Sequence, residues 1–182
     1  RRIFDGLDRA HEEAIEALAR IYEQKEAWEE LNAVYERQLE NAMGDVQEAE
    51  IRAKIAHLAA DRLGDPARAI ETWKRVLDLR GEDPEALRAL ANLYEAGDQW
   101  AELCDVLERE LDIATDDATR VEILNRRARI FLEKLGRPEQ ALDDYQRAVD
   151  IDFANLTALR AIAAIWRDRN EPNELVQALH TL

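Results

Sequence analysis

The histidines, the cysteine and the carboxylates are the side chains of this 182-residue chain that could do chemistry. His57 and Asp61 stand one helical turn apart, a spacing at which two side chains of one helix could hold a metal ion. The residues 72 positions further along are Arg129 and Glu133, so we interpret the pair as part of a solvated helix face. The chain has no second cysteine and no glycine-rich phosphate loop. The sequence therefore predicts no metal and no cofactor.

Catalysis by a nucleophile or by paired acids finds equally little support. Cys104 is the single cysteine, and we find no base partner for it of the kind that a catalytic thiol needs. It stands where the first copy of an internal repeat has Asn32, which predicts a tolerated, partly exposed position. The three histidines lie far apart in the sequence. The 40 acidic residues bring some carboxylates together by chance, so close pairs alone would not indicate an enzyme. We predict that this chain is not one.

The net charge of the chain limits the classes of partner that it can bind. It has 25 basic and 40 acidic residues, a formal net charge of −15, which repels nucleic acids and anionic membrane surfaces. Residues 12–50 alone hold 12 acids and 3 bases, either as a solvated surface or as a patch that attracts basic segments of a partner. No apolar run approaches the roughly 20 residues of a membrane span, and no signal-peptide core is present. These features favour a cytoplasmic location.

Proline and glycine mark the ends of the elements that must position any site. All four prolines open apolar-periodic stretches, where a missing N–H is harmless, and Asp65 and Asp83 before two of them suit helix N-caps. Glycines at 44, 64, 81, 97 and 136 stand where such stretches end, as left-handed C-terminal caps do. Between these marks apolar residues recur every three or four positions, and an all-α fold follows. We predict helices at 3–24, 27–42, 46–63, 66–80, 84–97, 99–114, 118–135, 138–151, 156–169 and 172–181.

An internal duplication organises these helices. Residues 12–83 and 84–155 align without a gap over 72 positions, and 25 of those positions are identical. A partial third copy follows, in which Trp166 takes the place of Tyr94. Aromatic residues recur with the repeat, which favours a packing role over a stacking platform for ligands. The duplication predicts one array of about five antiparallel hairpins in residues 1–182, with hairpins at about 12–42, 46–80, 84–114, 118–151 and 156–182.

The repeated residues resemble the tetratricopeptide repeats. Their first helix carries Trp-x2-Leu-Gly-x2-Tyr and their second carries Ala-x3-Phe. Here the first pattern becomes Leu87-x2-Leu90-Ala91-x2-Tyr94, and the second becomes Ala141-x3-Tyr145. The two patterns lie in alternate hairpins. The resemblance covers nearly the whole chain and implies a right-handed α-solenoid that binds other proteins.

The resemblance also implies that the first helix of each hairpin lines a concave groove. The groove-facing register carried over from the family gives Glu16 and then four successive bases, with Asn92 one turn beyond the second of them. Guanidinium groups bind carboxylates with two parallel hydrogen bonds, and an amide bonds a peptide backbone. Alternatively, the bases simply pair with nearby acids of the chain. The candidate groove residues are Lys54, Arg88, Asn92, Arg126 and Arg160.

The sequence thus predicts a protein-interaction scaffold that binds a peptide or a partner helix in its groove. The alternatives are a structural spacer and an accessory domain of a larger, enzymatic protein. The chain starts within an apolar stretch and has no polar capping helix at either end, which indicates a fragment of a longer array. Terminal helices with exposed apolar faces also predict self-association.

Overall fold

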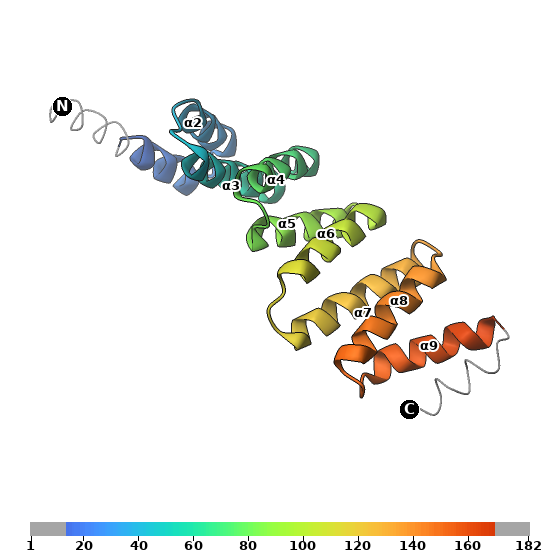
Figure 1. The fold of residues 1–182 in the computed structure, drawn as a ribbon. Helices are drawn as coiled ribbons and strands as arrows, with labels where there is room; N and C mark the ends of the chain where they lie inside the picture. The colour runs from blue at the N-terminus through green and yellow to red at the C-terminus, as the bar shows by residue number, and fades with distance from the viewer. Residues whose placement is uncertain (1–13, 170–182) are drawn as a thin grey trace. The chain divides into compact units, whose positions relative to one another are not determined.

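The chain is a succession of α-helices in a computed structural model that describes residues 14–169. Those residues contain no strand, which confirms the predicted all-α class (Figure 1). Where they are described, the helices differ from their predicted bounds by at most two residues. The predicted helix at 172–181 and the start of the first helix lie outside the described residues. A helical segment at 14–24 precedes α2 (Trp28–Glu40), α3 (Asp45–Asp61), α4 (Pro66–Arg80), α5 (Pro84–Ala96), α6 (Trp100–Ile113), α7 (Asp117–Glu133), α8 (Pro138–Ile151) and α9 (Leu156–Asp168).

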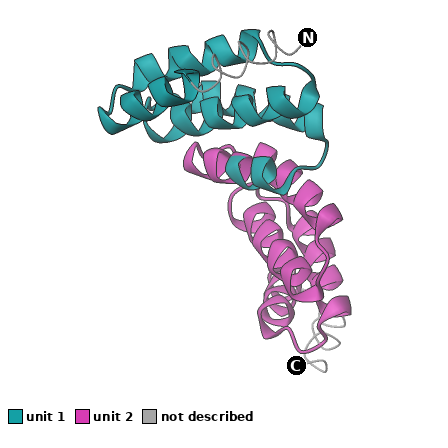
Figure 2. Cartoon of the chain, turned by 90° about the vertical axis from the view of Figure 1, so that its left-hand side faces the viewer, with its two compact units in different colours: residues 1–89 teal, residues 90–182 magenta. Residues whose placement is uncertain are grey.

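The helices gather into two compact units, residues 1–89 and 90–182 (Figure 2). In the first unit α3 packs against α2 and α4, and in the second α7 packs against α6 and α8. Because α3 and α7 each contact two neighbours, residues on more than one of their faces are buried, Leu58 and Ile130 among them. Alanines at 49, 56 and 59 of α3 are fully buried and let neighbouring helices approach closely. The single array over residues 1–182 stays a prediction.

Side-chain caps start several helices, and two of them, Asp65 and Asp83, are the caps that the sequence predicts. The Asp65 carboxylate accepts a hydrogen bond of 3.0 Å from the N–H of Arg68 in α4. The Asp83 carboxylate accepts two bonds of 3.0 Å from N–H groups in the first turn of α5. Asp116 caps α7, where hydrogen bonds from the backbone and hydroxyl of Thr119 lower the pKa of its carboxyl group. These caps satisfy donors that a helix start leaves unpaired.

The glycines predicted to be left-handed C-terminal caps are confirmed with two exceptions, Gly97 and Gly44. Gly97 does not adopt a positive φ; the next residue, Asp98, takes it instead at 54°. Glu26, which stands 72 positions before Asp98, has φ 53°, so this turn belongs to the repeat rather than to one glycine. A left-handed backbone costs a residue with a side chain about 1–2 kcal/mol. Gly64, Gly81 and Gly136 have positive φ after their helices as predicted, whereas Gly44 has φ 89° but is the N-cap of α3, and Asn41 is the C-cap of α2.

A cation covers a tryptophan ring at the same place in both copies of the repeat. The Arg62 guanidinium lies 4.9 Å from the centre of the Trp28 ring, and the Lys134 ammonium lies 4.7 Å from that of Trp100. Each cation follows the first helix of one hairpin, and each tryptophan starts the second helix of the hairpin before it. The contact therefore ties consecutive hairpins together and occupies the ring face that a stacked ligand would need.

We expect Lys134→Met to lower the free energy of unfolding by about 0.5–1 kcal/mol, because methionine keeps the apolar stem and removes the charge over the Trp100 ring. Urea unfolding followed by circular dichroism measures the change. Lys134→Arg is the control and should match the parent chain. An unchanged free energy in Lys134→Met would show that the ring contact adds no stability.

Candidate functional site

The exposed face of α5 carries two of the predicted groove residues. Arg88 and Asn92 lie one turn apart on this helix and are both exposed. Its opposite face is fully buried through Leu87 and Leu90. Among residues 14–169 neither Arg88 nor Asn92 has a hydrogen bond or an ion pair. Both side chains are thus exposed on a helix whose opposite face is buried.

The other three predicted residues lie on three different helices. Arg160 is exposed on α9 and, like Arg88, has no ion pair within the part of the chain that the structure describes. Lys54 is exposed on α3, with its ammonium 5.9 Å from the centre of the Tyr35 ring. Arg126 on α7 donates to the Glu95 carboxylate of α5 at 2.8 Å. Arg126 therefore pairs with an acid of its own chain.

Relative to the buried positions of their helices, Arg126 on α7 and Arg88 on α5 do not occupy equivalent positions. The buried positions of α5 recur on α7 after 37 residues, so that Leu87 corresponds to Leu124 and Tyr94 to Phe131. Arg126 then corresponds to Ala89, the neighbour of Arg88. Alignment by the 72-residue copies could not show this, since it relates only alternate hairpins. The counterparts of Arg88 and Asn92 on α7 are Asn125 and Arg129.

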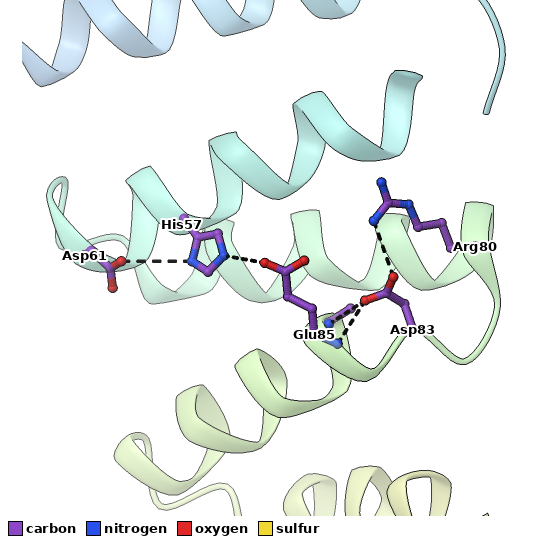
Figure 3. A network of polar contacts seen from close by, with 6 residues as sticks. His57, Asp61, Arg80, Asp83 and Glu85 are labelled. Atoms are coloured by element: carbon purple, nitrogen blue, oxygen red, sulfur yellow. Dashed lines mark hydrogen bonds and ion pairs between the residues drawn. The ribbon is translucent and has the colours of Figure 1, made fainter. Parts of the chain in front are cut away.

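The His57 side chain joins α3 to the start of α5 (Figure 3). Its Nε2 lies 3.1 Å from a Glu85 carboxylate oxygen, and its Nδ1 lies 4.0 Å from Asp61. The imidazole also meets the Trp73 ring edge-on, with 4.9 Å between the ring centres. No group of three or more metal-ligating side chains occurs between residues 14 and 169. Arg80 pairs with the capping Asp83 at 3.3 Å nearby, so the network serves the packing of α5.

The second unit contains a buried ion pair that the sequence did not predict. The Arg127 guanidinium donates through two nitrogens to the Asp144 carboxylate, with 2.6 Å between Nε and Oδ2, and also contacts Glu108. The Arg127 and Asp144 side chains are only 7% and 1% exposed. Arg147 completes the cluster at 3.4 Å from Asp144. The sequence does contain a sign of this pair, because the first copy has the uncharged residues Ile55 and Thr72 at the positions that correspond to Arg127 and Asp144.

Cys104 is buried, and the prediction of a partly exposed position was wrong. Cys104 belongs to the buried face of α6, together with Leu103 and Leu107. Burial raises the pKa of its thiol to about 11, against a smaller opposing effect of Arg127. The thiol therefore stays protonated near pH 7, and only the thiolate is a good nucleophile.

Comparison with known proteins identifies the repeat. Sequence models of tetratricopeptide repeats match residues 14–50, 86–121 and 121–155, more than half of the chain. No curated protein matches the sequence. Among solved structures, two crystal structures of MamA share 18% and 17% identity with TM-scores of 0.54 and 0.56. The aligned parts cover 90% and 92% of this chain and 91% and 87% of the MamA chains.

A tetratricopeptide repeat protein from Parabacteroides merdae shares 12% identity with a TM-score of 0.59, over 92% of this chain and 64% of its own length. At such identities the likeness concerns the fold alone. No described helix is long and apolar enough to cross a membrane. Repeats of this type present surfaces for binding other proteins, and this supports a general role as a protein-interaction scaffold. From its repeat matches and its all-helical fold, the chain belongs to the tetratricopeptide repeat family.

Proposed function

We propose that the chain binds an acidic peptide, or a partner helix with an acidic face, on the first helices of its hairpins. In this proposal Lys54, Arg88, Arg126 and Arg160 engage carboxylates, and Asn92 bonds the peptide backbone. The observation that carries the proposal is the state of Arg88 and Arg160. These two occupy the same repeat position, are exposed, and have no ion pair among residues 14–169 in a chain of net charge −15.

The four bases are not expected to contribute equally. Arg126 would have to leave the Glu95 carboxylate before it could engage a ligand, and part of its interaction with a ligand would replace that ion pair. Arg88 and Arg160 have no such contact to break within the described residues. The proposal therefore ranks Arg88 and Arg160 above Arg126 as determinants of binding.

A peptide-binding experiment tests this ranking. An array of synthetic peptides of graded net charge is probed with the chain, and we expect the bound peptides to be rich in Asp and Glu. The double variant Arg88→Glu/Arg160→Glu should weaken their binding by about tenfold or more, because two attractive contacts become repulsive. The matched control is Arg37→Glu/Arg75→Glu, which makes the same charge change at exposed positions of α2 and α4.

Each outcome assigns a role. Loss of acidic peptides in the first double variant and their retention in the control would support the proposed surface. Equal binding by both variants would place binding elsewhere on the chain. Absence of any bound peptide would favour a structural spacer, for which the internal Arg126–Glu95 pair is the supporting observation. An accessory role in a larger, enzymatic protein fits the same outcome.

A further inference from the structure

The helical segment at 14–24 has the residue pattern of α9 but not its burial. Leu18 and Ile21 stand 144 positions before Ile162 and Ile165, and in both helices an apolar residue occupies each place. Ile162 and Ile165 are 6% and 5% exposed, whereas Leu18 and Ile21 are 44% and 47% exposed. One repeat position is thus buried in one copy and open in another. Something that covers α9 has no counterpart on the 14–24 segment.

The missing cover is a helix of known chemistry. In the chain α9 packs against α8, the helix that precedes it, and among residues 14–169 no helix precedes the 14–24 segment. The buried side of α8 carries Ala141, Tyr145 and Ala148. Its counterpart α4 repeats this pattern with Ala69, Trp73 and Val76. The face of the 14–24 segment therefore fits an amphipathic helix with alanine, an aromatic residue four positions later, and a small apolar residue three positions beyond.

Charge selects between the two versions of that helix. Residues 14–30 hold five acidic and two basic side chains. The α4 sequence, Pro66–Arg80, has four bases and two acids, whereas α8, Pro138–Ile151, has one base and four acids. Opposite charges around an apolar contact favour association, and like charges oppose it. A basic helix of the α4 type complements this end of the first unit.

We propose that the face centred on Leu18 and Ile21 docks a basic amphipathic helix of another polypeptide, of the α4 pattern. A second copy of this chain has no helix free for the purpose among its described residues, because Trp73 of α4 and Tyr145 of α8 are only 1% and 4% exposed in their own chain. This inference does not rest on the proposed peptide binding.

A synthetic peptide with the sequence of α4, residues 66–80, is the probe. We expect labelled peptide to bind the whole chain saturably, and hydrogen exchange to show new protection of the amides at 14–24. Leu18→Glu should weaken binding by at least about tenfold, because it places a charge in the apolar contact. Val46→Glu is the matched control, since Val46 is a 70% exposed apolar residue on α3, and it should leave binding unchanged. The α8 peptide, residues 138–151, should bind more weakly than the α4 peptide.

Several results would overturn the proposal. One is peptide binding that survives Leu18→Glu, and another is no binding at all. Strong protection of amides 14–24 in the free monomer would mean that the chain itself covers this face. A dimer in sedimentation experiments that Leu18→Glu dissociates would assign the face to a second copy. Arg88→Glu/Arg160→Glu should not alter binding of the α4 peptide, so a failure here is distinct from a failure of the proposed function.

Discussion

Arg127→Ile is expected to lower the free energy of unfolding by about 3–5 kcal/mol, because it leaves the Asp144 carboxylate buried with only Arg147 nearby. Asp144→Thr should cost less, since Arg127 keeps its contact with Glu108. Both substitutions introduce the residue that the first copy has at the same place, Ile55 or Thr72. The α3–α4 hairpin of the same chain thus already buries both of the new side chains at the corresponding places.

The double variant Arg127→Ile/Asp144→Thr should recover most or all of the loss. Replacing a complete buried ion pair by residues that pack well is often neutral, or stabilising by about 1–4 kcal/mol, because no charge remains to be desolvated. Urea unfolding of the parent, the two single variants and the double variant gives the coupling energy directly. Arg126→Ile, at the neighbouring part-exposed ion pair with Glu95, is the control and should cost about 1 kcal/mol or less. Additive single and double effects would show that Arg127 and Asp144 do not act as a pair.

Trp73→Ala is expected to destabilise the first unit by about 3–5 kcal/mol, because it leaves a cavity that the surrounding helices fill only in part. Trp73 is 1% exposed and is one of the largest fully buried side chains of the described residues. Its ring meets the His57 imidazole, which in turn contacts Glu85 of α5. The substitution therefore removes both packing within α3 and α4 and the support of the His57 contact.

The internal repeat again supplies the matched variant. Trp73→Tyr introduces the residue of the second copy, Tyr145, which is 4% exposed in its own site. We expect it to cost less than about 1.5 kcal/mol, as for other core substitutions that keep the volume nearly constant. Hydrogen exchange of the α3 and α4 amides locates the effect, since stability in a repeat protein is a sum of local terms. A loss in Trp73→Ala no larger than that of the exposed Arg75→Ala would contradict a packing role.

Local rules predicted the helices of this protein well. Prolines at helix starts, acidic caps and glycines at helix ends act within a few residues, so their effects appear in the sequence alone. Asp65 and Asp83 cap their helices as predicted, and the Gly97 turn failed by a single residue because Asp98 takes the left-handed backbone. The same turn in the first copy also has a residue other than glycine, Glu26, in the left-handed backbone conformation.

The surroundings of the candidate site residues depend on contacts between helices as well as on spacing within each helix. Exposed Arg88 and Asn92 follow from the apolar spacing of α5, which places them opposite Leu87 and Leu90. The partner of Arg126 lies 31 residues away on another helix, and spacing within α7 does not reveal it. The register between α5 and α7 is also tertiary, because it depends on where each helix meets its neighbours.

The sequence by itself determined the all-α class, the repeat, the family and nearly all helix bounds, because these follow from periodicity and from residues at helix ends. Only the tertiary structure decided which polar side chains are buried and which are open. Arg127 is a charged residue in an apolar register and became internal because Asp144 meets it from α8. Leu18 is an apolar residue in the same register as Ile162, yet it is 44% exposed whereas Ile162 is 6% exposed. In both cases burial depends on the neighbouring helix and not on the residue's own type.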